Sequence, residues 1–385
     1  MNYNRRNKNG STLTIRVMCA IVFVVFSLAW LYCFQADVIA MTQHQLSGGL
    51  THYNKVVGTL IITTLLLLLQ LVVYGFTRLK KRTHALTYVP SMLVLSMLTD
   101  VSQQIASDDG ITHTVSWWGV VLVIAVWLPV VFLARQFQEV EEDSSYSLVS
   151  RPMWINMLMM SVMMMGVAWL GNTDAVFHYR MQVEGLLAEG KFDKAVKVGR
   201  KSLESDQHLL MLRMYALART GGLGDHLFEY PISGTSQDML PTNGRTRMML
   251  CPEDSLYRFL GARPAEKMAP VRYLQMLLRR DSVPRKTIGD YLLCSYLIDK
   301  DLDRFAREVG RYYVVDDKLP KHYREALILY AHLRANPLFV YQNPVMEEDF
   351  GNLRDMEQQY PMLSERKGKV GEQYRSTYWY YYNYE

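Results

Sequence analysis

The feature that constrains this chain most is a set of long, uncharged apolar runs in its first 171 residues. A helix needs about 20 mostly apolar residues to cross the hydrocarbon layer, because lipid offers no partner for unpaired backbone groups. Five segments are predicted to cross the membrane: 17–34, 56–76, 85–101, 117–134 and 152–170. The sequence therefore predicts a transmembrane domain over residues 1–171, with the lipid bilayer as its first partner.

Two of these segments leave an alternative open. Segment 85–101 contains Pro90 and ends at Asp100, so a re-entrant or interfacial helix is the alternative to a full span. A small-residue pattern that resembles a signal-peptide cleavage site, 38–40, follows the first run. That run is longer than a usual signal core, which favours an uncleaved span.

The distribution of basic residues predicts the orientation, because Lys and Arg resist translocation. From the N-terminus, the segments outside the spans carry four, one, four, none and two basic residues. Five spans with a cytoplasmic N-terminus agree with every number in this series. We therefore expect a multi-pass protein of the cytoplasmic (inner) membrane whose C-terminal domain is periplasmic or extracellular.

The interiors of the spans lack the charged side chains that transporters and proton pumps use. Gln70 is expected to form a hydrogen bond between helices rather than a transport site. The methionines of 153–165 are expected to fill gaps in packing rather than to bind copper. No Cys/His pattern indicates a zinc site, and we expect neither a metal nor a cofactor.

The second half of the chain differs sharply in composition and is predicted to be a helical domain. Residues 172–385 carry thirty-one Lys/Arg and twenty-nine Asp/Glu, without a basic block long enough to follow a phosphate backbone, so nucleic acid is not an expected partner. Residues 172–340 have helical spacing with Gly and Pro breaks. The predicted fold class is therefore all-α, with about five transmembrane helices followed by an array of helical hairpins.

One stretch of this half resembles the second helix of a tetratricopeptide repeat. That motif requires Gly at the turn, an aromatic residue two positions later and Ala three positions after that, and Gly190, Phe192 and Ala195 meet these requirements. Ser202 and Ala216 occupy later small positions. A second, weaker copy aligns Ala195 with Ala306 and gives Cys294 the small position. The resemblance covers about 100 residues and implies helices that stack into a curved array.

The whole layout is similar to a family of uncharacterised bacterial multi-span membrane proteins with a tetratricopeptide-like outer domain. The residues that carry this likeness are 319–326 and the aromatic run 378–382. The resemblance implies an architecture and no activity, and it implies more spans than five.

The last segment, 341–385, ends in an aromatic-rich tail. Seven of the final twelve residues are aromatic, and we expect the tail to fold back onto the array, since so many exposed aromatics would be costly. A docking strand or a carbohydrate-stacking platform is the alternative. A Cys251–Cys294 disulfide is left open, because sequence does not set its geometry.

No sequence motif indicates catalysis, so we do not expect an enzyme, although the sequence does not decide this. The leading hypothesis is a membrane-anchored scaffold whose repeat domain binds a protein or peptide partner. The alternative is an envelope enzyme of the lipid-linked glycan transferase type. Its carboxylates would be Asp100, Asp108 and Asp109, in or beside an outer connection.

Overall fold

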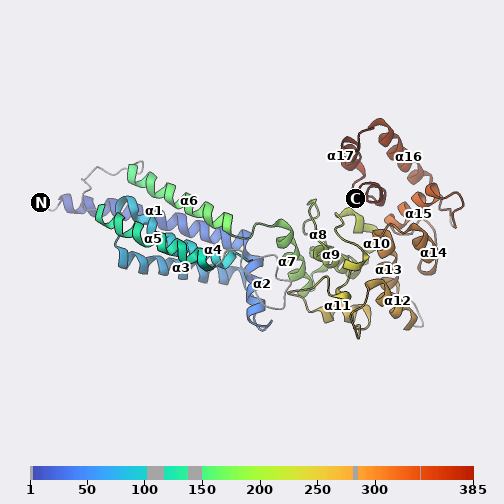
Figure 1. The fold of residues 1–385 in the computed structure, drawn as a ribbon, viewed down its shortest axis with the longest axis horizontal. Coiled ribbons are helices and arrows are strands. Elements are labelled where there is room, and N and C mark those ends of the chain that lie inside the picture. Colours follow the sequence, from blue (N-terminus) through green and yellow to red (C-terminus); the bar gives the residue numbers. More distant parts are fainter. Residues whose placement is uncertain (1–2, 102–116, 138–149, 281–284, 339) are drawn as a thin grey trace. The chain divides into compact units, whose positions relative to one another are not determined.

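The computed structural model describes residues 3–101, 117–137, 150–280, 285–338 and 340–385. These residues form helices joined by turns, with no strand in the described ranges, which confirms the all-α prediction (Figure 1). The chain divides into two compact units, Met1–Asp174 and Ala175–Glu385. Each unit is described by itself below.

The first unit is a bundle of mostly apolar helices. Its elements are α1 (Tyr3–Ala29), the π-helix η1 (Trp30–Phe34), α2 (Ala36–Leu46), α3 (Lys55–Thr77), the 3-10 helix η2 (Lys81–Tyr88), α4 (Val89–Thr99), α5 (Trp117–Phe137) and α6 (Arg151–Leu170). Among the described residues, four helices are long and apolar enough to cross a membrane: Leu13–Phe34, Lys55–Thr77, Trp117–Gln136 and Arg151–Leu170.

The fifth expected span, 85–101, is not one regular helix, and the structure departs here from the continuous helix that the sequence predicts. The chain there forms η2 and then the eleven-residue α4. Pro90 is the physical reason, because proline has no N–H to donate and disfavours helical geometry in the residue before it. The C=O of Leu86, whose α-helical partner would be the nitrogen of Pro90, accepts a hydrogen bond from Trp127 Nε1 of α5 at 2.9 Å.

A buried amide in α6 compensates for the same irregularity. Asn156 is fully buried, and its Oδ1 accepts the backbone N–H of Ala85 at 2.7 Å. Further along, the N–H of Asn172 donates to the C=O of Thr99 at 2.9 Å. The earlier residues of the two segments, Ala85 and Asn156, contact each other, and so do the later residues, Thr99 and Asn172. The segment formed by η2 and α4 therefore runs parallel to α6.

Two further helices of the bundle, α3 and α1, are oriented by similar contacts. Gln70 Nε2 donates to Thr87 Oγ1 at 2.9 Å, which confirms the helix–helix hydrogen bond predicted for this residue. Ser91 Oγ donates to the C=O of Leu66 at 2.8 Å, so α3 runs antiparallel to η2 and α4. Helix α1 runs parallel to them, because Phe23 packs on Tyr88 and Trp30 lies near Thr99. The start of α1 and the end of α3 therefore lie at one end of the bundle.

The second unit is an array of short helices around one continuous core. Its helices are α7 (Ala175–Ala188), α8 (Phe192–Lys197), α9 (Gln207–Thr220), α10 (Leu223–His226), α11 (Glu253–Leu260), α12 (Pro270–Arg280), α13 (Lys286–Ile298), α14 (Leu302–Tyr312), α15 (Lys321–Leu333), α16 (Pro344–Gln359), α17 (Leu363–Tyr374) and α18 (Tyr378–Tyr384), with short 3-10 turns η4 (Leu227–Glu229), η5 (Ser236–Asp238) and η6 (Pro241–Asn243). Successive helices pack as hairpins, such as α7 on α8 and α13 on α14 (Figure 1).

The α7–α8 and α13–α14 hairpins share one turn geometry. Gly190 (φ 72°) and Lys300 (φ 58°) are left-handed, and each N–H donates to the C=O three residues back. In both turns the next N–H reaches five residues back, which is how a left-handed residue closes a helix. Gly190 is thus equivalent to Lys300, and the sequence alignment of Ala195 with Ala306 is displaced by one residue. A lysine replaces the expected glycine, so the true register is hidden in the sequence.

The second helix of the motif is much shorter than expected. Helix α8 ends at Lys197, because Val198 is extended and Gly199 adopts φ 62°. A Cβ at Gly199 would lie 3.0 Å from the ring of Tyr179 and 3.1 Å from Nη2 of Arg213. The chain therefore turns here against α7 and α9, where a regular repeat continues its helix.

Candidate functional site

The residues selected by the repeat motif serve mainly in packing. Four of them are fully buried in the core: Ala195, Ala216, Cys294 and Ala306. Gly190 forms the α7–α8 turn, with open space around it. Phe192 is half-buried under the guanidinium of Arg219, 4.3 Å from the ring centroid.

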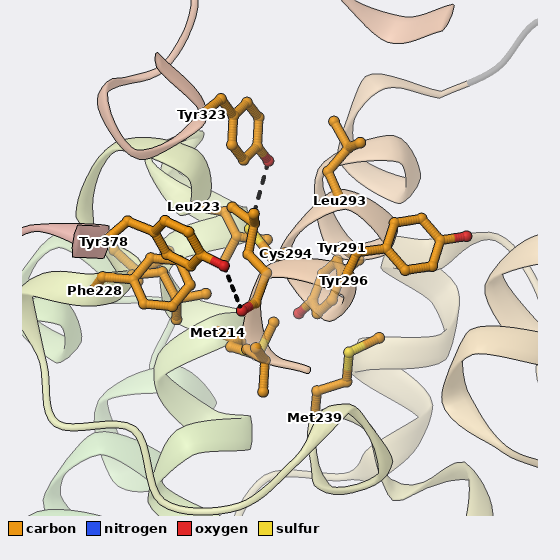
Figure 2. Close-up of a cluster of buried hydrophobic side chains, with 14 of the residues drawn as sticks. Met214, Leu223, Phe228, Met239, Tyr291, Leu293, Cys294, Tyr296, Tyr323 and Tyr378 are labelled. Carbon is orange, nitrogen blue, oxygen red and sulfur yellow. Dashed lines mark hydrogen bonds between the residues drawn. The ribbon is translucent and has the colours of Figure 1, made fainter. Parts of the chain in front are cut away.

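Cys294 has a polar neighbour within the core. Its Sγ lies 3.5 Å from Oη of Tyr323, on α15, as Figure 2 shows. Cys251 is also buried, and both are free thiols, as are Cys19 and Cys33. The disulfide left open by the sequence is therefore not formed.

The carboxylates proposed for the alternative enzyme do not form a described site. Asp100 directly follows α4, is 3% exposed and donates its backbone N–H to the C=O of Ser96. Asp108 and Asp109 lie outside the described residues. Within the described ranges, no group of three or more His, Cys, Asp or Glu side chains is arranged to hold a metal ion.

The aromatic tail folds back onto the array, which confirms the packing prediction. Helix α18 packs on α15 and α17, and Tyr378, Trp379 and Tyr380 are each 2% exposed or less. The ring of Tyr378 enters the buried cluster and meets Phe228 edge-on at 4.9 Å (Figure 2). The alternative role of these three rings as an exposed platform is therefore excluded.

A buried charged residue fixes the start of the tail. Glu325 is 2% exposed, and its Oε2 accepts the N–H of Tyr378 at 2.7 Å and lies 2.9 Å from Nδ1 of His322. Its backbone C=O accepts Trp379 Nε1 at 2.7 Å. Thr377 caps α18 by accepting the N–H of Tyr380. No local sequence pattern indicates this network, because it joins segments more than fifty residues apart.

A second buried carboxylate holds an irregular segment of the unit. Glu184 of α7 accepts the backbone N–H groups of Met249, Leu250 and Cys251, the last at 3.2 Å. Burial raises the pKa of Glu184, and the neighbouring Arg180 and these three N–H groups oppose that shift. Glu184 thus fixes the chain before α11, and we assign it a structural role.

The candidate binding site is a pocket beside the tail, which we call the basic pocket. It has a volume of about 470 Å³ and is formed by the loop after α8, the end of η4, and α17 and α18. Its charged lining residues are the cations Arg200, Lys201, Lys367 and Arg375 and the carboxylates Glu229 and Glu385. Ser202, predicted as a repeat position, also lines it. Four cations face two carboxylates, so the pocket attracts anions.

The cations of the basic pocket differ in how they are already paired. Arg200 Nη2 lies 2.8 Å from Glu229 Oε2. Lys367 Nζ donates to the C=O of Tyr384 at 2.9 Å. In the described part of the chain, Lys201 and Arg375 form neither a hydrogen bond nor an ion pair, and both are exposed. These two side chains are therefore available to a ligand.

The anion of the chain itself in this pocket is Glu385. Burial raises the pKa of its carboxyl, while a backbone hydrogen bond to Ile232 and the charges of Lys367, Arg375 and Lys300 lower it. The pocket thus already surrounds one carboxylate with cations. Sequence reasoning missed it, because its two sides come from segments over 130 residues apart.

The described residues combine four apolar helices of membrane-spanning length, which indicate a membrane protein, with an all-helical C-terminal unit and a basic pocket. The chain belongs to a family of unknown function, DUF6057, whose family model matches residues 109–273 and 269–385. No curated protein and no solved structure matches it. The expected likeness to an uncharacterised family is therefore confirmed at that level.

Proposed function

We propose that this protein is a membrane-anchored binding protein. The bundle holds the unit 175–385 at the cytoplasmic (inner) membrane of a bacterium, on the outer side, and that unit binds a protein or peptide partner. The observation that carries the proposal is the basic pocket, which presents two unpaired cations in a well-packed helical unit. Cationic pockets with adjacent aromatic side chains are typical of binding surfaces rather than of cores.

The charge at the two ends of the bundle supports the outer location. Arg16 of α1 stacks over the ring of Tyr74 of α3 at 4.3 Å, at the end of the bundle where the apolar run Leu13–Phe34 begins. The described basic residues of this end include Arg16, near the start of the apolar run Leu13–Phe34, and Arg78, directly after α3. They also include Lys80, directly before η2, Arg82 within η2, and Arg151 at the start of α6. Positive ends of membrane bundles face the cytoplasm. The chain leaves α6 at the opposite end, where Asn172 meets Thr99.

The length of the irregular segment supports the same orientation. The 3-10 helix η2 has eight residues and α4 has eleven, and together they rise about 32 Å. The hydrocarbon layer is about 30 Å thick. Their contacts run along α6 from Asn156 to Asn172, two residues beyond the end of α6, so we assign η2 and α4 together as a fifth crossing. An odd number of crossings puts the N-terminus and unit 175–385 on opposite sides.

The hairpins support a tetratricopeptide-like array. The shared turn geometry at Gly190 and Lys300 repeats one helix–turn–helix unit, and stacked units of this kind form binding surfaces. The short α8 and the irregular region around η5 and η6 depart from regular repeats. We therefore propose a degenerate array in which the loop after α8 forms part of the binding site.

Site-specific photo-crosslinking tests the function. A photoreactive amino acid replaces Leu203, which lines the basic pocket and is 62% exposed. The matched control replaces Val314, which is 77% exposed and lies outside the pocket lining. We expect a discrete adduct from position 203 that is absent from position 314. Identical adduct patterns, or none from either position in cells that express the full chain, would refute the proposal.

A further inference from the structure

The charge in the basic pocket is not balanced by the chain itself. Glu229 is already shared, because its Oε2 pairs with Arg200 and its Oε1 lies 3.0 Å from Nδ1 of His226. These contacts lower the pKa of Glu229 although its partial burial acts in the opposite direction. Lys201 and Arg375 have no comparable partner among the residues that the structure describes. The pocket therefore has spare cationic donors for a carboxylate or phosphate.

The walls of the pocket indicate which anion it suits. Leu203 and Pro231 provide apolar surface, and Tyr380 provides an aromatic side chain that is otherwise buried. A bare inorganic anion gains nothing from contact with these groups. A peptide segment gains from both, because its carboxylates meet the cations while its apolar side chains cover the exposed Leu203.

The chain itself provides a precedent for this arrangement. The tail presents an aromatic segment that ends in Glu385, and the Glu385 side chain lies in the pocket with Lys367 and Arg375. One acidic group beside aromatic side chains is thus already accepted there. Lys201 lies on the wall formed by the loop after α8, and the residues of this loop that line the pocket include no carboxylate.

We infer that the basic pocket binds a segment of the partner protein that carries acidic side chains next to apolar ones, with Lys201 and Arg375 as the cations that recognise it. This inference rests on the proposed function and names the chemistry of its partner. Binding forms two exposed ion pairs, each of modest strength, and contact with Leu203 adds to them. The affinity is therefore moderate and sensitive to salt.

Fluorescence anisotropy of the full-length protein in detergent tests the inference. The probe is a short fluorescein-labelled peptide of alternating glutamate and leucine, and the matched probe replaces each glutamate by glutamine. We expect the glutamate peptide to bind at least about tenfold more tightly at about 50 mM salt, and this preference to shrink at about 500 mM salt. Equal binding of the two probes would overturn the inference.

A pair of double variants locates the binding. Lys201→Ala with Arg375→Ala should weaken binding of the glutamate peptide about tenfold, since two exposed ion pairs are lost. The control, Arg279→Ala with Arg280→Ala, removes the same charge from exposed positions of α12 outside the pocket and should leave binding unchanged. Equal effects of the two double variants would overturn the assignment to this pocket. Inorganic phosphate that binds the protein while the glutamate peptide does not would overturn it as well.

The inference and the proposed function fail in different ways. A partner adduct at position 203 together with equal binding of the two probes refutes the acidic chemistry and leaves the binding function standing. Charge-dependent peptide binding without any adduct in cells refutes the proposed function and leaves the chemistry of the pocket standing.

Discussion

Replacing Glu325 by alanine should release the aromatic tail from the helical unit. The substitution removes the acceptor of the Tyr378 N–H at 2.7 Å and the partner of His322 at 2.9 Å, both in a buried setting. Lys321 Nζ, 3.8 Å from the same carboxylate, also loses its ion pair. Two buried polar groups are thereby left without their partner.

The magnitude follows from these lost partners. A hydrogen bond to a charged group contributes about 1.5–3 kcal/mol, and the Glu325 carboxylate has two such buried partners, the Tyr378 N–H and the His322 ring. We therefore expect Glu325→Ala to lower the free energy of unfolding of the helical unit by about 3–5 kcal/mol. Glu325→Gln keeps one oxygen acceptor and should cost less than Glu325→Ala, about 1–2 kcal/mol.

Glu347 provides the matched control. Its carboxylate lies 2.8 Å from Nε2 of His332, but its side chain is 37% exposed, so Glu347→Ala should cost less than about 1 kcal/mol. The assay is pulse proteolysis of the full-length protein in detergent across a urea gradient, which measures the fraction of the helical unit that is unfolded. If Glu325→Ala and Glu347→Ala shift the midpoint equally, the tail is not held by the buried carboxylate and the reasoning fails.

Three further changes test other parts of the account. Gly199→Ala should lower the free energy of unfolding by about 2 kcal/mol and Gly190→Ala by about 1 kcal/mol, because both residues have positive φ but only Gly199 is crowded. Equal shifts of the midpoint in the same urea assay would contradict this expectation. Asp290→Asn should stabilise the unit at pH 7 and much less near pH 4. Burial raises the pKa of Asp290, so the native state with Asp290 loses stability as pH rises above the ordinary pKa of an aspartate. Urea titrations at the two pH values measure this, and a stabilisation that does not depend on pH would refute it. Asn156→Leu should cost about 1 kcal/mol in the thermal stability of the detergent-solubilised bundle, since the buried N–H of Ala85 loses its acceptor, and an unchanged melting temperature would contradict it.

The membrane helices were predictable because a single physical requirement dominates them. Lipid cannot satisfy backbone groups, so a long uncharged run has few other structures open to it. The segment 85–101 does not form the single regular helix that this rule predicts. Pro90 prevents one regular helix, and the compensating hydrogen bonds come from Asn156 and Trp127 on other helices. No local sequence pattern predicts these long-range hydrogen bonds.

The helical unit was predictable in class but not in detail. Gly190 marked its turn correctly, whereas Lys300 adopts the same left-handed geometry without the glycine that would reveal it. The basic pocket was not predictable, because Lys201 and Arg375 meet only after the tail has packed. Each of them looks in the sequence like an ordinary exposed charge. The buried positions Ala195, Ala216, Cys294 and Ala306 followed from the repeat motif. The binding site depends on long-range packing.

The side of the membrane that carries the helical unit tests the central claim most directly. In a Cys33→Ser background, which removes the one exposed cysteine, a single new cysteine is introduced at Ser364, an exposed position of α17, or at Gln136, an exposed position at the end of α5. Sealed cells are then treated with a membrane-impermeant maleimide before or after lysis. The account predicts that Ser364→Cys is labelled in sealed cells and that Gln136→Cys is labelled only after lysis. Labelling of Ser364→Cys only after lysis would place the helical unit in the cytoplasm and contradict the account.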